Sequence, residues 1–452
     1  MTSKTKFRVV LLPLVTGALV ACSDYSPNPV QNAAGDPSGA DGTVDTDTGR
    51  VEGSPTQSPS VAGASGSAVA EGNPTLGISG AGSVGAGGAA SNGAAGAEAV
   101  AVGGAAGAAG SGVVAEGRGP GPCDIFASGN TPCVAAYSTV RALSSTYAGP
   151  LYQVRRGAPN PLQNTGTGGE TQDIGMLASG FADAAAQVAF CANQTCTVSA
   201  IYDQSGRGNT VTVAKRGRID GGEFGDDDDF ESRADAGPLT VGGNNVFSLF
   251  MEPRQGYRQT VAGNGMPRGQ EPQGIYMLAD GTHVGGACCW DFGNVTTDPT
   301  QYAVMNTMFF GQAYWGRGAG NGPWFMADFE AGVWAGGSNP GEPGWGALSQ
   351  PAPLNPNNPS LRVRFALGFL KTATNYALRM ADLQTATDLT TAYEGLLPKP
   401  MNNEGAVVIG VGGDNSNNSF GTFFEGAIVA GYPSADVELA VMQNVQSAGY
   451  GQ

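Results

Sequence analysis

The sequence predicts an all-β fold, an antiparallel β-sandwich or jelly roll, preceded by a disordered tether. Three observations predict it: several segments of alternating or continuous apolar character, few and short helical patterns, and a composition with 73 glycines and 13% charged residues. Such a composition suits a loop-rich β protein and argues against a helical bundle. The formal net charge of −16 excludes a nucleic-acid binder, which needs a basic face.

The first 22 residues have the pattern of an export signal. Basic residues precede an apolar run over 9–21, which is shorter than the roughly 17–25 residues of a membrane span. The run ends in LVAC, which is typical of bacterial lipoproteins that carry a lipid on the cysteine; an ordinary cleavage site is the alternative. We therefore expect residues 1–22 to be a lipoprotein-type signal peptide. Lipidation at Cys22 would be the only membrane attachment, at the outer membrane or cell surface of a bacterium.

Residues 23–119 are expected to form a disordered linker. Between Ser26 and Gly117 the chain has no aromatic residue, cysteine or lysine. Such a segment cannot bury enough apolar area to offset the ordering entropy of its backbone, roughly 1–2 kcal/mol per residue. A small folded domain hidden in this segment is the less favoured alternative.

Residues 120–452 are expected to fold as one domain, because nearly all aromatic residues and six of the seven cysteines lie there. Strands are predicted within 196–217, as a hairpin around SGRGN, and within 361–371, 405–414 and 425–433. One helix is predicted to start at Thr131-Pro132. Another is predicted after Ser434, with three valines on one face.

The six cysteines of this region come in close pairs: Cys123 with Cys133, Cys191 with Cys196, and Cys288 with Cys289. An even count in an exported protein favours disulfides. Fifteen connectivities are possible for six cysteines, and local pairing is the simplest of them.

Few residues can carry metal or nucleophile chemistry. The chain has one histidine, His283, which excludes histidine-rich zinc sites and is expected to be structural. The acidic run 226–229 is more typical of a solvated loop than of a calcium site. Glycine-rich runs at 316–322 and 410–415 lack the features of phosphate loops. We expect neither a cofactor nor a metal.

Carboxylates among aromatic residues and glycines remain as candidates. Asp328 and Glu330 are two residues apart in GPWFMADFEAGVW, and in a strand this spacing puts both on one face. Asp414 follows the apolar segment GAVVIGVGG. Paired acids with aromatic walls are what glycoside hydrolysis requires. A non-catalytic carbohydrate-binding sandwich is the alternative.

These motifs resemble the catalytic domain of glycoside hydrolase family 54, the α-L-arabinofuranosidase B type. The resemblance covers about Gly121 to Gln452 and rests on motifs in the same order: GPCDIF, TPCVAAYSTVRAL, FCANQTC, AIYDQSGRGN, DGTHVGGACCWDFGN, WGRGAGNGPWFMADFE, IGVGGDNSN and GTFFEGAIVAGYP. It implies a concanavalin-like β-sandwich. It also implies the release of terminal α-L-arabinofuranosyl groups from arabinoxylan and arabinan, with retention of configuration.

The resemblance assigns roles to particular residues. Glu330 looks like the nucleophile and Asp414 like the acid/base, and Asp328 looks like a residue that grips the sugar hydroxyls. Trp315 would line the pocket, and the Gly413 backbone would lie against the sugar.

In this family the adjacent cysteines form a disulfide at the floor of the sugar pocket, which implies a Cys288–Cys289 bond here. Consecutive Cα atoms are about 3.8 Å apart, less than the roughly 4.4–6.8 Å usual across a disulfide. The ring is therefore expected to be rigid and to cost little ordering entropy when a furanose binds against it.

The sequence departs from the family pattern in two places. Ala331-Gly332 follows the expected nucleophile where relatives have two asparagines, which puts subsite preference in doubt. Relatives usually carry a C-terminal β-trefoil, whereas this chain stops at Gln452, so weaker attachment to insoluble polysaccharide is expected. We also expect a monomer whose partners are arabinose-containing polysaccharides or oligosaccharides.

Overall fold

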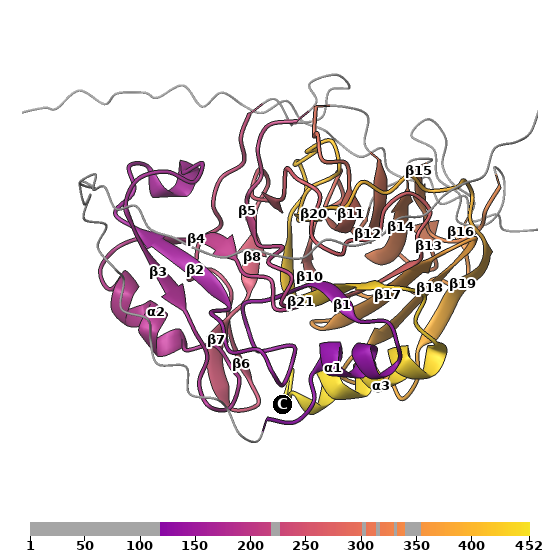
Figure 1. The fold of residues 1–452 in the computed structure, drawn as a ribbon, viewed down its shortest axis with the longest axis horizontal. Coiled ribbons are helices and arrows are strands. Elements are labelled where there is room, and N and C mark those ends of the chain that lie inside the picture. Colours follow the sequence, from indigo (N-terminus) through magenta and orange to yellow (C-terminus); the bar gives the residue numbers. More distant parts are fainter. Residues whose placement is uncertain (1–117, 218–226, 301–303, 313–316, 330–331, 340–353) are drawn as a thin grey trace, which may run out of the picture. The chain divides into compact units, whose positions relative to one another are not determined.

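The structure, a computed structural model, describes residues 118–217, 227–300, 304–312, 317–329, 332–339 and 354–452. Two large antiparallel sheets carry most strands of this part of the chain, as Figure 1 shows, so the all-β prediction is confirmed. The expected signal peptide, Cys22 and the expected linker up to residue 117 lie outside the described residues. The domain boundaries therefore stay predictions.

The first sheet has seven strands, most of them buried along nearly their whole length. Six follow the order β1 (Cys133–Ser138), β21 (Gly421–Ala430), β10 (Gln273–Val284), β17 (Ala366–Thr372), β18 (Asn375–Asp382) and β19 (Thr390–Leu396), and β8 (Leu249–Met251) pairs with β21. The continuous apolar character of the central strands follows from their burial on both faces.

The second sheet has ten strands. Their order is β15 (Gly332–Trp334), β14 (Trp324–Phe329), β12 (Met305–Gly311), β11 (Asp291–Val295), β20 (Ala406–Ile409), β9 (Tyr257–Arg258), β5 (Val211–Val213), β4 (Cys196–Ile201), β2 (Tyr152–Arg156) and β3 (Glu170–Ile174). Two small ribbons accompany the sheets: β6 (Pro238–Val241) with β7 (Asn244–Phe247), and β13 (Arg317–Gly318) with β16 (Leu354–Asn355). The predicted hairpin within 196–217 is β4 and β5.

The core lies between the two sheets. Phe292 in β11 packs edge-on against Phe423 in β21, with 5.2 Å between the ring centroids. Phe329 in β14 meets Tyr376 in β18 at the same distance. At Gly368 in β17, an added Cβ would lie 2.6 Å from the Phe325 ring, so glycine is needed for the sheets to approach this closely.

Helices are few and short in the described residues: α1 (Pro122–Ser128), α2 (Ala184–Cys191), α3 (Ala435–Ser447) and the 3-10 turn η1 (Pro161–Gln163). The helix predicted after Ser434 is confirmed as α3, and the Ser434 hydroxyl accepts a hydrogen bond from Val437 N at its start. Within the described ranges, none of these helices has the length and apolarity needed to span a bilayer.

The helix predicted to start at Thr131-Pro132 is wrong. The residues that follow form β1, which is buried throughout and pairs with β21 inside the first sheet. The helix of this region lies earlier, in α1, where Pro122 occupies the first turn and the Asp124 carboxylate accepts a hydrogen bond from Gly121 N at 2.7 Å. Sheet pairing over long distance therefore overrode a local helix-start signal.

Disulfides join neighbouring cysteines. The Cys123–Cys133 bond connects α1 to the start of β1, and the Cys191–Cys196 bond connects the end of α2 to the start of β4. Each closes a short loop, so these bonds fix the entry to a strand more than they restrict the whole chain.

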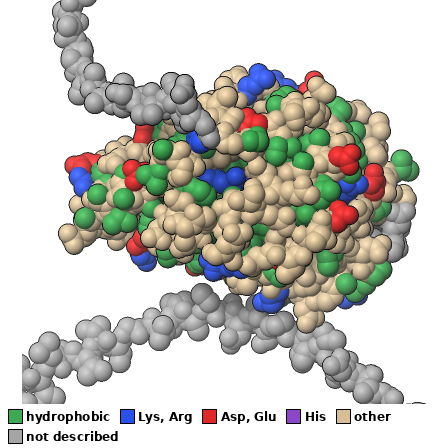
Figure 2. Space-filling model, turned by 90° about the horizontal axis from the view of Figure 1, so that it is seen from below, with side chains coloured by type: hydrophobic (Ala, Val, Ile, Leu, Met, Phe, Trp, Pro, Cys, Tyr) green, Lys and Arg blue, Asp and Glu red, His purple; other side chains and the backbone are tan. Residues whose placement is uncertain are grey.

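The first sheet contains a buried ion pair between Arg141 and Glu425. Two guanidinium nitrogens donate to the two carboxylate oxygens, each at 2.7 Å, and the Tyr450 hydroxyl donates to the same carboxylate at 2.7 Å. Figure 2 shows one face of the molecule, on which charged side chains of both signs lie in small separate groups. The continuous basic surface of a nucleic-acid binder is not seen on that face.

Replacing Glu425 by alanine should destabilise the domain strongly, because Arg141 would stay buried without its counter-charge. We expect the free energy of unfolding to fall by about 3–5 kcal/mol, measured by urea denaturation followed by tryptophan fluorescence. Asp235→Ala is the matched control. It breaks the exposed Arg233–Asp235 pair and should change stability by less than about 1 kcal/mol. Equal effects of the two variants would contradict the expectation.

Candidate active site

The predicted site residues meet at neighbouring strands of the second sheet. Asp328 lies on β14, Cys288 and Cys289 directly precede β11, and Asp414 lies in the loop that follows β20. Because β14, β12, β11 and β20 are consecutive in the sheet, three segments far apart in the sequence converge. Glu330 and Trp315 lie outside the described residues.

Cys288 and Cys289 form a disulfide beside Asp328. The Cys289 sulfur lies 3.7 Å from Asp328 Oδ2. Cys289 is buried and Cys288 half-buried. The peptide bond between them is cis and their Cα atoms are 2.9 Å apart, in place of the about 3.8 Å assumed above for a trans peptide.

The loop that carries Asp414 is fastened to this disulfide through the backbone. Cys289 N donates to Ser416 O at 3.2 Å, and Asn418 N donates to Cys288 O at 3.2 Å. The loop also closes on itself, because Gly412 N donates to Ser416 O at 3.0 Å. The position of Asp414 relative to the disulfide is thus set by main-chain bonds.

Asp414 is half-buried, and one of its oxygens is occupied. Ser416 donates to Asp414 Oδ1 twice, from its backbone nitrogen at 3.0 Å and its hydroxyl at 2.6 Å. No described residue hydrogen-bonds to Asp414 Oδ2. The carboxyl group is therefore held in one orientation and is not sealed in the interior.

Arg258 supports the same loop from β9. Its guanidinium is buried and donates to Gly413 O at 2.7 Å and to Thr296 O at 2.6 Å. Burial lowers the pKa of Arg258 to about 10, and the charge of Asp414 opposes this shift. Gly413, which was expected to present its backbone to the sugar, thus has its carbonyl fixed by a cation.

Asp229 anchors the loop on another side. Its carboxylate accepts hydrogen bonds from the side-chain amides of Asn415, at 3.2 Å, and Asn417. Asp229 is fully buried, and burial raises its pKa to about 7. Asp229 is the last residue of the acidic run 226–229.

That acidic run is solvated only in part: Asp227 is exposed and Asp228 half-buried, while Asp229 is buried. Asp226 lies outside the described residues, while Asp227 pairs with Arg254 and Asp228 pairs with Lys215. Among the described residues of the run, only Asp229 contacts the loop that carries Asp414. The run of like charges does not indicate that Asp229 is buried. The only related signal in the sequence is Asn415 and Asn417 in GGDNSN, whose side-chain amides can donate hydrogen bonds to a buried carboxylate.

Asp291 is a site residue that sequence reasoning missed. It is the first residue of β11, it is 1% exposed, and its carboxyl group contacts that of Asp328, which is 2% exposed. Burial raises the pKa of both groups, that of Asp328 to about 7 and that of Asp291 further. The signal for Asp291 was an acid inside the apolar segment CCWDF.

His283 lies in an aromatic cluster. Its ring stacks on Phe250 with 3.8 Å between centroids, and its Nδ1 hydrogen-bonds to the Thr422 hydroxyl at 2.8 Å. Burial lowers the pKa of His283. These contacts fit the structural role expected for it.

Among the described residues, one group of three has donor atoms close enough to share a metal. The ligand atoms of Cys288, Cys289 and Asp328 lie within 4.8 Å of one another. Both sulfurs are joined in a disulfide, so the group offers one carboxylate and no thiolate, which is a poor donor set for a metal.

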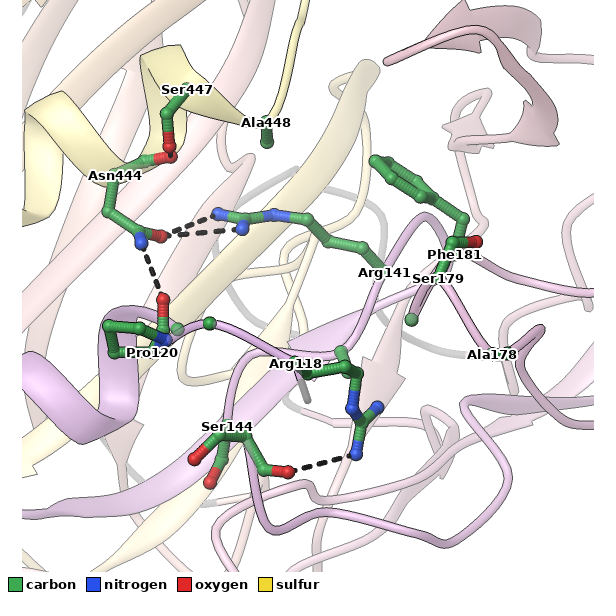
Figure 3. A pocket seen from close by; sticks show the side chains of 15 residues that line it. Arg118, Pro120, Arg141, Ser144, Ala178, Ser179, Phe181, Asn444, Ser447 and Ala448 are labelled. Carbon is green, nitrogen blue, oxygen red and sulfur yellow. Dashed lines mark hydrogen bonds between the residues drawn. The ribbon is translucent and has the colours of Figure 1, made fainter. Parts of the chain in front are cut away.

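A cavity of about 330 Å³ lies elsewhere, between the start of the described chain and α3 (Figure 3). Arg141 points toward it, but its guanidinium is already bound by Glu425 and by Asn444 Oδ1. None of the predicted catalytic or sugar-binding residues lines this cavity.

Comparison with known proteins identifies relatives of this domain. Residues 122–451 match the family model described as "Alpha-L-arabinofuranosidase B, catalytic". An alpha-L-arabinofuranosidase of Hypocrea jecorina is 44% identical over 339 residues, which are 73% of this chain and 63% of that protein. An arabinofuranosidase/B-xylosidase of Trichoderma koningii is 43% identical with the same coverage.

Solved structures of the same kind are similar. A GH54 arabinofuranosidase crystallised with arabinofuranosyl-alpha-1,2-xylobiose has a TM-score of 0.64 and 40% identity, and the match covers 73% of this chain and 65% of that chain. A mutant GH54 enzyme soaked with 4-nitrophenyl a-l-arabinofuranoside gives the same values. The chain thus spans less than two thirds of the length of the relatives it matches.

The relatives correct the predicted localisation. They are proteins of fungi, from Hypocrea, Trichoderma and Aspergillus. The relatives thus point to a eukaryotic enzyme, and the prediction of a lipid-anchored protein at the surface of a bacterium is wrong.

The buried carboxyls of the site should make the domain more stable in mild acid. Asp229 and Asp328 have pKa values of about 7 when folded, against about 3.9 unfolded. The folded state therefore binds their protons more tightly, and stability falls as the pH rises from about 4 to about 7.

Unfolding free energies at pH 5 and pH 8 check this expectation. For Asp229→Asn the loss of stability between these pH values should be smaller than for the wild type by roughly 2–3 kcal/mol. Asp235→Asn, at an exposed carboxylate, is the control. An unchanged pH dependence in Asp229→Asn would show that Asp229 ionises normally in the folded protein.

Proposed function

The chain belongs to the family of α-L-arabinofuranosidase B catalytic domains, glycoside hydrolase family 54, and on this premise we propose that it is a retaining glycosidase. It releases terminal non-reducing α-L-arabinofuranosyl residues from arabinoxylan or arabinan, or from oligosaccharides derived from them. A relative of known structure binds arabinofuranosyl-alpha-1,2-xylobiose, which supports this substrate class.

The observation that carries the proposal is the convergence of Asp414, Asp328 and the Cys288–Cys289 disulfide. A half-buried acid with one oxygen fixed by Ser416 lies on a loop bonded to a disulfide, and a buried acid contacts the sulfur of that disulfide. Glu330 follows Asp328 by two residues in the sequence. A sugar held against the disulfide would have acids from two different segments next to it.

The proposed reaction is a double displacement. The Glu330 carboxylate attacks the anomeric carbon, and the bond from this carbon to the departing sugar oxygen breaks as protonated Asp414 gives that oxygen its proton. Ionised Asp414 then takes a proton from water. The water oxygen attacks the anomeric carbon and releases Glu330, and two inversions retain the configuration. This chemistry requires about 5–5.5 Å between the two carboxyl groups.

Sugar binding is assigned to the remaining residues. Asp328 accepts hydrogen bonds from furanose hydroxyls, and the Cys288–Cys289 disulfide forms the floor against which the ring lies. Gly413 contributes its backbone and Trp315 a wall. Gly412 supports the packing of this loop, because a Cβ there would lie 3.3 Å from Cys289 Cβ. That the protein acts as a monomer stays a prediction.

Two alternative functions predict different results when chromogenic substrates are compared. A lectin-like module would bind arabinan and hydrolyse nothing. An enzyme for another sugar would differ in pocket shape, and the Trichoderma koningii relative is named as a B-xylosidase as well. Ala331-Gly332, where the family pattern has two asparagines, is the position at which a changed preference would arise.

The wild-type protein should hydrolyse 4-nitrophenyl α-L-arabinofuranoside faster than the corresponding β-xyloside and galactofuranoside. Glu330→Ala should lose measurable turnover because no carboxylate remains to form the glycosyl-enzyme, and its melting temperature should equal that of the wild type. No hydrolysis of any of the three by the wild type would favour the lectin-like module, and an active Glu330→Ala would refute the nucleophile assignment.

Asp414→Ala should discriminate between leaving groups. For an arabinoxylan oligosaccharide, whose leaving oxygen needs a proton, kcat should fall by about 10²–10⁴-fold. For the 4-nitrophenyl glycoside the first step should be nearly unaffected, and added azide should restore turnover by replacing water in the second step. The same loss on both substrates, with no effect of azide, would contradict the acid/base assignment.

A further inference from the structure

Asp291 and Asp328 form a carboxyl pair that the reaction described above does not explain. Asp291 lies on β11 and Asp328 on β14, and β12 runs between these strands. Both side chains are almost completely buried, and their carboxyl groups lie within hydrogen-bonding reach of each other. The pair therefore results from sheet register and not from proximity in sequence.

The surroundings of the two carboxyl groups differ. No described residue donates a hydrogen bond of regular geometry to either oxygen of Asp291, and the groups within reach are the Asp328 carboxyl and the Thr307 hydroxyl. Asp328 Oδ2 faces the disulfide, where the sugar is proposed to bind. Asp291 is thus the deeper of the two acids.

Two ionised carboxylates cannot share a dry contact, because their repulsion adds to the cost of burying each charge. A contact of this kind is stable when one proton lies between the groups and one of them donates to the other. Asp291 is the deeper acid, and apart from Asp328 only the Thr307 hydroxyl lies within reach of it among the described residues, so it is the group that holds the proton. Asp328 keeps the negative charge.

We propose that Asp291 is a positioning residue: it stays protonated at neutral pH and donates a hydrogen bond that orients Asp328 as an ionised acceptor for the sugar hydroxyls. The inference rests on the proposed function and deepens it. It explains how a buried acid can carry a charge toward the sugar while the site as a whole holds only one charge from the pair.

Few titratable groups of the described residues face this pair. The charge of Asp414, in the loop after β20, raises the pKa of both carboxyl groups, and Arg258 on β9 interacts with Asp414. Cys289 is disulfide-bonded and does not titrate. Loss of the Asp291 proton at high pH would add a second negative charge beside Asp414.

Infrared difference spectroscopy tests the proton assignment without using activity. The wild type at pH 7 should show the C=O stretch of a buried protonated carboxyl that is missing in Asp291→Asn and still present in Asp328→Asn. A band that is missing in Asp328→Asn and present in Asp291→Asn would place the proton on Asp328 and overturn the proposal. This outcome is independent of whether the protein is an arabinofuranosidase.

Kinetics test the positioning role. Asp291→Asn keeps a donor of the same shape, so its KM should stay within a few-fold of the wild type, and its activity should extend to higher pH. Asp291→Ala removes the donor, and its KM should rise by about 10- to 100-fold with a smaller change in kcat. Asp235→Ala is the control and should behave as the wild type.

Two kinetic outcomes would overturn the proposal. Wild-type KM and pH profile in both Asp291 variants would show that the residue does not act through Asp328. An equal rise in KM in Asp291→Asn and Asp291→Ala, at unchanged melting temperature, would show that the role of Asp291 does not depend on donating a hydrogen bond. If Asp291→Ala does not fold, Asp291→Asn and the infrared measurement still decide.

Discussion

Two backbone hydrogen bonds between the Cys288–Cys289 disulfide and the loop at 416–418 determine the geometry of the site. They join a segment that precedes β11 to one that follows β20, and the other contacts of Asp414 depend on this junction. Ser416 can orient the Asp414 carboxyl because its own carbonyl is held by Cys289 N. Main-chain bonds of this kind do not depend on side-chain identity. They fix the position of the loop and leave its side chains available for substrate binding and catalysis.

Much of the fold could be predicted from local patterns, and the part that could not depends on contacts between distant segments. Continuous apolar runs identified β17, β20 and β21, and the Ser434 cap identified α3. The Thr131-Pro132 signal failed because pairing with β21 decides that segment. The order of ten strands in the second sheet has no local signal at all.

The same limit applies to the site. Asp328 and Asp414 could be identified as candidates because each is an acid in a glycine-rich or aromatic context. Asp291 lies in a similar context, in CCWDF, but like Asp229 it is recognised as a buried residue of the site only when its partners are known. For Asp291 the partner lies on β14, two strands away, and for Asp229 it lies beyond β20. The residues that hold the site in place are therefore harder to read from a sequence than those that act in it.

Buried acids of the site and buried acids elsewhere in the domain are compensated differently. Glu425 on β21 is bound by Arg141, and Glu438 on α3 is bound by Lys371 on β17, so each of these acids has a cation beside it. In the site the described residues give Asp291 and Asp328 no cation, and Arg258 is engaged by backbone carbonyls. What compensates the second acid there is a proton. A cation would fix the charge of the site permanently, whereas a proton can be kept, shared or lost as the pH changes. The proposed reaction passes its protons between Asp414, the leaving oxygen and water, so the proton of the Asp291–Asp328 pair stays in place, and a lower stability above neutral pH is the consequence of this kind of compensation.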